Sequence, residues 1–158
     1  MRLKLVGGDT NEGADGRSLK EELLAGLSDL HHGRIKFMGH VPHNELAALY
    51  RKAAICVFPS RVEAMCLVVL EAMASSRAVV VSKSDCFREV VADGVTGLVA
   101  DASNPGDIAQ KIGRLLENLT LADQLGRAAR DAVMAKFDLP VAVDRNLEFY
   151  RRVIEQGR

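Results

Sequence analysis

The sequence predicts an α/β fold, a doubly wound parallel sheet with helices on both faces. Short apolar runs rich in valine and isoleucine alternate with longer stretches of helical period, and this alternation is typical of parallel sheets. The runs are continuously apolar, which indicates strands that are buried on both faces. The length of 158 residues is that of one ordinary domain, and no internal repeat or linker interrupts it.

Five apolar runs are the expected strands, and they lie at residues 3–6, 35–38, 55–58, 78–81 and 98–99. Gly7, Gly39 and Pro59 directly follow the first three runs, as expected of residues that end regular structure. Ligands of doubly wound sheets bind at the carboxyl ends of the strands. The loops that follow the five runs therefore form the candidate site.

Helical period fills the intervals between and after the strands. The expected helices lie at residues 19–30, 46–53, 66–74, 88–92, 105–119, 121–133 and 140–155. Ser18, with Glu21 three residues later, forms a capping-box pattern before the first helix. Asn104 and Pro105 are a start signal for the fifth, and Thr120 is the expected cap of the sixth.

The composition excludes several classes of function. Lysine plus arginine number 21 and aspartate plus glutamate also number 21, so no positive field attracts nucleic acid or anionic lipid. The content of 48% hydrophobic and 27% charged residues is that of a folded, soluble domain. The longest apolar runs, residues 53–58 and 64–70, are far shorter than the ~20 residues of a membrane-spanning helix.

The three cysteines predict no disulfide framework. Cys56, Cys66 and Cys86 show no C-x-x-C spacing, and their number is odd. The first residues also lack the long apolar stretch of a signal peptide. Together these features predict a soluble domain of a reducing compartment, the cytoplasm.

Several familiar active-site motifs are absent from the sequence. It contains no G-x-S-x-G elbow and no G-x-x-x-x-G-K-[ST] phosphate loop, and the turn at Gly7 and Gly8 lacks the dinucleotide fingerprint. No Asp-x-Asp occurs to bridge a metal to a nucleotide diphosphate. His40 and His43 are interpreted as loop histidines, because neither a cysteine nor a helical i, i+4 spacing accompanies them. We expect no metal and no cofactor.

The segment from residue 58 to 81 contains the strongest candidates for functional residues. Glu63 precedes a predicted helix and Glu71 lies inside it, eight residues later. Backbone amides at a helix N-terminus attract anions, whereas a carboxylate repels phosphate and is better suited to accept hydrogen bonds from sugar hydroxyls. On composition alone, the opposite interpretation is favoured, in which Glu63 is a loop carboxylate and Glu71 a solvated helix residue.

A series of short motifs instead favours functional roles for Glu63 and Glu71. In chain order it runs Gly39-x-Val41-Pro42, Glu45-Leu46-x-x-Leu49-Tyr50, Pro59-Ser60-x-x-Glu63, Leu70-Glu71-Ala72-Met73-Ala74, and Glu89-Val90-Val91-x-Asp93-Gly94-x-Thr96-Gly97. It resembles the nucleotide-sugar-binding half of retaining GT-B-fold glycosyltransferases of group 1, family four type. That large family includes sucrose synthase and bacterial polysaccharide and phosphatidylinositol mannosyltransferases. The resemblance covers nearly the whole chain, and the fold it implies is the Rossmann-like C-terminal half of a GT-B fold.

The resemblance implies roles for the two glutamates. Glu63 matches the catalytic position beside the transferred sugar, and Glu71 matches the one that holds the ribose hydroxyls of the nucleotide. The amides at the start of the helix match those that reach the donor sugar and the distal phosphate. The substrate-binding positions implied in this segment are Ser60, Met65, Cys66, Leu67 and Val68.

Two earlier turns and the last helix also have counterparts in the family. His40 and Val41 match the turn that contacts the base, and Gly7 and Gly8 match a glycine-rich turn near the diphosphate. The helix expected at residues 140–155 resembles the one that crosses back onto the partner domain.

The chain departs from the family pattern at three places. Ala64-Met65-Cys66 replaces the usual Gly-Phe-Gly after the first glutamate, and a cysteine side chain there is expected to crowd the sugar. Ser76-Arg77-Ala78 replaces Gly-x-Pro before the fourth strand, and Asp85-Cys86 replaces Gly-Gly in the loop after it.

We therefore interpret residues 1–158 as a single donor-binding domain that lacks its first strand and the N-terminal acceptor domain. The implied enzyme is a retaining, metal-independent transferase of polysaccharide biosynthesis with a UDP- or GDP-sugar donor. Without the family's Arg/Lys clamp, only Arg61 or Lys83 remains near the diphosphate, so this chain alone is expected to be inactive. Its partner is the acceptor domain, through which alone it would touch a membrane. The alternative is a non-catalytic binding or interaction module.

Overall fold

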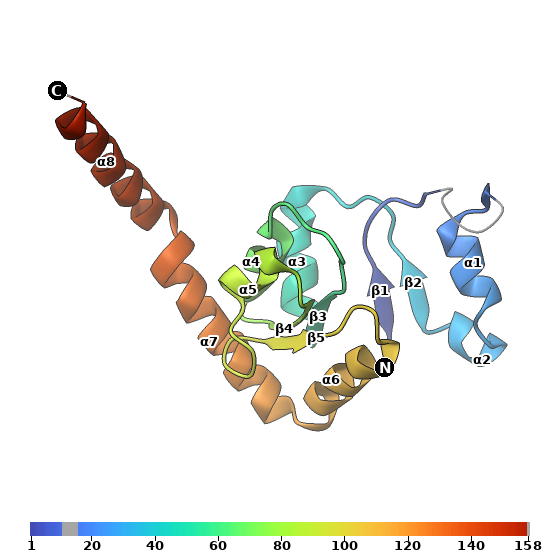
Figure 1. Cartoon of the computed structure of the whole chain (residues 1–158). Coiled ribbons are helices and arrows are strands. Elements are labelled where there is room, and N and C mark those ends of the chain that lie inside the picture. The colour runs from blue at the N-terminus through green and yellow to red at the C-terminus, as the bar shows by residue number, and fades with distance from the viewer. Residues whose placement is uncertain (11–15, 158) are drawn as a thin grey trace. The chain divides into compact units, whose positions relative to one another are not determined.

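The computed structural model describes residues 1–10 and 16–157 (Figure 1). The chain divides into two compact units, Met1–Leu46 and Ala47–Arg158, and each is considered by itself below. The assignment of all 158 residues to one donor-binding domain stays a prediction.

The first unit contains a two-stranded parallel sheet. Strand β1 (Leu3–Leu5) pairs with β2 (Ile35–Phe37), with Leu3 opposite Ile35. In the sequence, helices α1 (Leu19–Ala25) and α2 (Asp29–His32) lie between these two strands. Both strands begin where their apolar runs predict.

The first expected helix is two helices. Ser18 caps α1 as predicted, because its hydroxyl accepts a hydrogen bond from the Glu21 amide at 3.2 Å. The expectation of one helix through residue 30 is wrong, since α1 ends at Gly26 and α2 starts after Ser28. Glycine and serine are both typical of helix ends, and here they outweigh the leucine periodicity.

The second unit contains a three-stranded parallel sheet in the order β3-β4-β5. The strands are β3 (Ile55–Phe58), β4 (Ala78–Ser82) and β5 (Leu98–Ala100). All three confirm the predicted runs. Their parallel pairing through helical connections is the arrangement of an α/β fold.

Six helices accompany this sheet in the described chain, and they carry the predicted segments with small shifts. They are α3 (His43–Lys52), α4 (Leu67–Ala74), α5 (Asp85–Val90), α6 (Pro105–Glu117), α7 (Leu119–Phe137) and α8 (Leu139–Gln156). Asn104 caps α6 as expected, by accepting from the Gly106 amide at 3.0 Å. The cap of α7 is Asn118 rather than Thr120, because the Asn118 side chain accepts from the Leu121 amide at 2.9 Å.

Strand β4 shows that both faces of the sheet are covered. All five of its residues are buried. Val79 and Val81 belong to one core cluster, which is completed by α4, α5 and α7. Ala78 and Val80 belong to the other, with Leu115 of α6 and residues of α7. Alternate residues of β4 thus face two different cores, one on each side of the sheet, which confirms the doubly wound arrangement.

Helix α4 ends in a Schellman motif packed against α7. The Ser76 amide donates to the Met73 carbonyl at 2.9 Å and the Arg77 amide to the Ala72 carbonyl at 3.1 Å. Ser76 takes the left-handed φ of 56° at the position where glycine is favoured. Gly126 of α7 lies so close that a Cβ there would be 2.5 Å from the Ser76 carbonyl oxygen.

Within the described residues, none of the helices combines the length and the apolar character needed to cross a membrane.

Candidate functional site

The carboxyl ends of β3 and β4 meet at one edge of the second unit. The Ser82 hydroxyl, at the end of β4, donates a hydrogen bond to the Ser60 carbonyl in the segment after β3. This bond ties residues 59–66, the connection from β3 to α4, to the neighbouring strand. The segment that carries Glu63 is thereby held at the edge where doubly wound sheets bind ligands.

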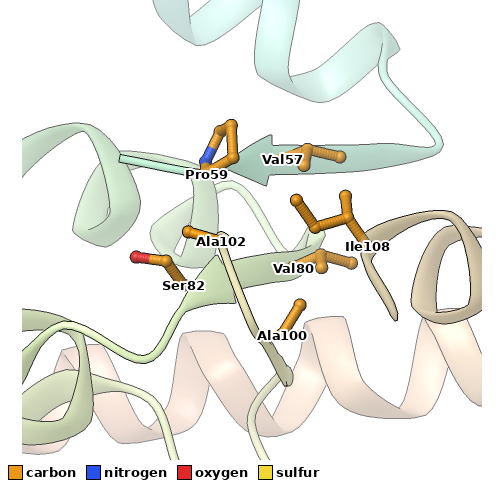
Figure 2. Close-up of a pocket in the computed structure, with 7 residues that line it drawn as sticks. All are labelled: Val57, Pro59, Val80, Ser82, Ala100, Ala102 and Ile108. Carbon is orange, nitrogen blue, oxygen red and sulfur yellow. The ribbon is translucent and has the colours of Figure 1, made fainter. Parts of the chain in front are cut away.

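A small apolar pocket lies beside the same strand ends but is separate from the predicted site. It has no room for a water molecule and is lined by residues such as Pro59, Ser82 and Ile108 (Figure 2). None of the predicted site residues lines it. Its apolar lining indicates an imperfection of packing between β3, β4, β5 and α6.

Glu71 lies in the second turn of α4 and is half-buried. The Tyr50 hydroxyl of α3 donates a hydrogen bond to its Oε2 at 3.3 Å. Burial, and next the Glu71 carboxylate, raises the pKa of Tyr50 well above its usual range, so the phenol remains a neutral donor at physiological pH. Glu71 is therefore oriented by a partner on another helix, unlike a fully solvated helix residue.

Glu63 lies in the β3–α4 connection and is half-buried. It precedes by three residues the N-cap of α4, Cys66, whose carbonyl accepts from the amides of Val69 and Leu70 at 3.0 Å each. The amides of Leu67 and Val68 thus lie ahead of the first helical bonds, where a helix leaves donors for other partners. The α4 start presents these amides close in sequence to a carboxylate.

The side chains around the α4 start are unusually apolar and exposed. Met65 is 64% exposed and Leu67 53% exposed. Because exposed apolar groups are typical of surfaces that a ligand or partner covers, this edge is suited to binding.

Cys66 and Cys86 form a disulfide, with their Cα atoms 6.3 Å apart. The expectation of unpaired cysteines is wrong for these two, while Cys56 is free and buried. Local spacing gave no signal for the pair, because only the adjacency of β3 and β4 brings the two following loops together. Cys66 is only 8% exposed, so its side chain packs in the core rather than crowding the exposed edge.

The loop after β4 holds the cation that the sequence offered as a diphosphate partner. Lys83 Nζ lies 3.6 Å from Asp101 Oδ2, and both side chains are largely exposed. The Ser84 hydroxyl next to it is buried, and the described residues offer it no hydrogen-bond partner. Arg61, the other candidate cation, is exposed in the β3–α4 connection.

In the first unit, the two predicted turns lie side by side. The Gly7 amide donates to the Gly39 carbonyl at 3.0 Å, which joins the end of β1 to the turn that carries His40 and Val41. Gly7 has a φ of 139°, which side chains rarely adopt. Gly8 and His40 are exposed and Val41 is half-buried.

The predicted site residues thus fall into two groups, one in each unit. In the first unit, the structure brings the turn at Gly7 next to the turn that carries His40. In the second, the remaining positions lie in the β3–α4 connection and on α4. Sequence reasoning missed two contributors to the second group, Tyr50 and Cys86. The first lies in the Glu-Leu-x-x-Leu-Tyr motif, whose order already marked it, whereas nothing local marked the second.

The chain also matches a known protein family. Residues 1–118 match the family described as glycosyl transferases group 1. The chain belongs to this family. The match includes both turns of the first unit, the β3–α4 connection and α4, and the GT-B, Rossmann-like fold expected from the motif string is confirmed.

Individual relatives agree with the family assignment. An uncharacterized glycosyltransferase of Methanocaldococcus jannaschii is 34% identical over 132 residues, which are 83% of this chain and 35% of the relative. Sucrose-phosphate synthase from Thermosynechococcus elongatus is similar in structure, with a TM-score of 0.81, 29% identity, and coverage of 98% of this chain and 39% of that one.

Anabaena HepE in complex with UDP and glucose shares the fold, with a TM-score of 0.82, 22% identity, and coverage of 96% of this chain and 40% of that one. This chain spans about a third of the length of the curated relative from Methanocaldococcus jannaschii, 35%.

Proposed function

We propose that this chain is the donor-binding half of a retaining glycosyltransferase, which transfers a sugar from a nucleotide diphosphate sugar to an acceptor hydroxyl. Family membership supports the reaction class. The observation that carries the donor site is the hydrogen bond from Tyr50 to Glu71. A carboxylate has several acceptor positions on its two oxygens, so a Glu71 that accepts a hydrogen bond from Tyr50 can also accept from ribose hydroxyls.

The exposed start of α4 supports the placement of the rest of the donor. The amides of Leu67 and Val68 suit the distal phosphate, because helix N-termini favour negative charge. Glu63, which precedes them in the β3–α4 connection, is then the carboxylate on the sugar side. For Gly7, Gly8, His40 and Val41 of the first unit, the roles near the diphosphate and the base stay those that the family resemblance implies.

The proposed reaction breaks the bond between the anomeric carbon and the diphosphate oxygen, which leaves with the electron pair. The acceptor oxygen forms its bond to the same carbon from the same face, and the proton of the acceptor hydroxyl passes to the departing diphosphate oxygen. The charge on the leaving group is stabilised electrostatically, and such stabilisation is often the largest catalytic contribution. Donor binding is proposed to need no metal ion, because the sequence has no Asp-x-Asp motif, and titrations with and without EDTA check this.

Helix α8 supports the proposal of a partner domain that binds the acceptor. Its residues are all at least partly accessible, and several apolar side chains of α8 are about half exposed, including Leu147 at 47% and Val153 at 51%. An amphipathic helix with so little contact to its own sheet is suited to pack on another domain. The partner proposed for this face is the acceptor domain.

The test is calorimetric titration of the full chain with UDP, GDP and ADP. UDP is the first choice, since the HepE structure that shares this fold is a complex with UDP. We expect saturable binding of one nucleotide and a loss of about tenfold or more in affinity for Glu71→Gln, because hydrogen bonds to a carboxylate are among the stronger ones. Glu148→Gln, an exposed position on α8, is the matched control. Unchanged affinity in Glu71→Gln would contradict the ribose assignment.

A further inference from the structure

The disulfide between Cys66 and Cys86 joins two loops at the candidate site. Cys66 is the N-cap of α4 and ends the connection that carries Glu63. Cys86 is the second residue of α5, in the segment that follows β4. The bond closes a separation of 20 residues, and it links the carboxyl-end loops of two adjacent strands.

The disulfide fixes the α4 start from the core side. Cys66 belongs to the buried cluster that contains Val69 and Phe87, and Cys86 packs against that cluster. Leu67, the next residue along the chain from Cys66, is 53% exposed. The covalent bond therefore holds the backbone of the α4 start in place while its outward amides remain open to a ligand.

The two sulfurs differ in access to a reductant. Cys86 is half-buried, whereas Cys66 is 8% exposed, so an attacking thiolate reaches the Cys86 sulfur first. The electron pair of the broken S–S bond then goes to the Cys66 sulfur. That sulfur then takes up a proton, and the Cys66 thiol can donate to the Cys86 carbonyl oxygen, which lies 2.9 Å away.

We propose that Cys66–Cys86 is a thiol–disulfide exchange site for dithiol reductants, and that its redox state sets the affinity of the α4 start for the nucleotide sugar. The inference rests on the proposed function, because it deepens the donor site described there. One thiolate of the dithiol forms a mixed disulfide with Cys86, and its second thiol then releases Cys86. In balance, the protein disulfide gains two electrons and two protons, and the dithiol is oxidised to its own disulfide.

The oxidised chain is the tighter binder. With the bond intact, the β3–α4 connection is held at both ends, by the hydroxyl of Ser82 on Ser60 and by the disulfide at Cys66. Reduction removes the second restraint, and a freed connection must be ordered again when the donor binds. The loss is partial, because the Cys66 sulfur lies 2.9 Å from the Cys86 carbonyl oxygen, to which a Cys66 thiol can donate.

The experiment compares the oxidised and the dithiothreitol-reduced full chain in titrations with UDP, GDP and ADP. Mass spectrometry after alkylation verifies one free thiol in the first state and three in the second. We expect reduction to weaken binding of the preferred nucleotide about fivefold, the scale of reordering a short segment. Cys66→Ser and Cys86→Ser should bind like the reduced chain and ignore the reductant. Cys56→Ala is the control, since Cys56 is outside the pair, and it should keep the full response.

Hydrogen exchange of the same samples separates the outcomes even if a variant folds poorly. Faster exchange at residues 59–68 in the reduced wild type, with α6 unchanged, supports the proposal together with the affinity change. Equal affinity of both redox states overturns the redox proposal and leaves the donor assignment standing. Absence of binding in both states contradicts the proposed function and overturns the redox proposal with it.

Discussion

The two ends of α4 are fixed by opposite means. At its start, Cys66 is covalently linked to Cys86 and its neighbours Met65 and Leu67 are exposed. At its end, Ser76 forms a tight turn whose backbone lies against Gly126 of α7. The outer side of the start is exposed, so the start is held from the core side, by the packing of Cys66 and Val69 and by the disulfide. The end is held by the hydrogen bonds of its Schellman motif and by close packing against α7.

The largest effect is expected at the covalent end. Reduction of the disulfide should lower the free energy of unfolding by about 3 kcal/mol, because the bond closes a loop of 20 residues in the unfolded chain. Urea unfolding with and without dithiothreitol measures it, and Cys56→Ala should show the same difference. A change below about 0.5 kcal/mol would mean that packing holds both ends of α4.

The packed end should respond to a single added methyl group. Gly126→Ala places a Cβ 2.5 Å from the Ser76 carbonyl oxygen, so the free energy of unfolding should fall by about 2 kcal/mol. Gly113→Ala on α6 is the matched control, because a Cβ there meets nothing within 4 Å. The control should gain up to about 1 kcal/mol from helix propensity. Equal stabilities in urea would contradict the close approach.

A smaller gain is expected at the turn itself. Ser76→Gly should raise the free energy of unfolding by about 1 kcal/mol, because glycine adopts the φ of 56° without the clash of a Cβ. Ser75→Gly, at an ordinary φ of −82°, should instead lower it. Thermal or urea unfolding of the pair measures both signs, and a loss in Ser76→Gly would show that the serine side chain has a role of its own.

In the middle of α4, Glu71 accepts a hydrogen bond from Tyr50, and removal of this bond should have the smallest effect. Tyr50→Phe should cost about 0.5 kcal/mol near neutral pH and weaken nucleotide binding through Glu71. The dependence of stability on alkaline pH is the more specific test of Tyr50 burial. Burial raises the pKa of Tyr50 from 10.0, so above that pH the unfolded chain releases a proton that the folded chain keeps, and stability falls as pH rises.

The Phe variant should show a shallower alkaline fall than the wild type in urea titrations. Burial also raises the pKa of the Cys56 thiol to about 11, and its contribution, lost as pH rises from 9.0 to that value, is common to both proteins. Tyr150→Phe, an exposed residue of α8, is the control and should keep the full fall. Parallel curves for Tyr50→Phe and the wild type would contradict the burial of the phenol.

The strands were predictable because each is a continuous apolar run with a sharp end. All five begin at the predicted residue, including Leu3, Ile55 and Leu98. Helix ends were less predictable, since Asn118 and Thr120 are both good caps and only the geometry of the α6–α7 corner selects Asn118. Local signals therefore fixed the elements, and three-dimensional context chose among the competing caps.

The candidate site likewise contains residues that local patterns predicted and residues that only the three-dimensional structure reveals. The spacing of Glu63 and Glu71, and the glycine at position 7, are local patterns that the sequence displays directly. The partners of the site, Tyr50 and Cys86, lie about 20 residues from the groups that they contact, with separations of 21 for the hydrogen bond and 20 for the disulfide. The hydrogen bond depends on the packing of α3 against α4, and the disulfide depends on the pairing of β3 with β4. Neither arrangement is visible in the local sequence.

The exposure of α8 has a consequence for how the chain melts. None of its 18 residues is buried, so α8 draws little stability from tertiary packing, and a helix of that length is marginal in water on its own hydrogen bonds. Its helicity should decline gradually on heating, as a sloping baseline in the far-ultraviolet circular dichroism, before the sheet and its helices unfold in one cooperative step.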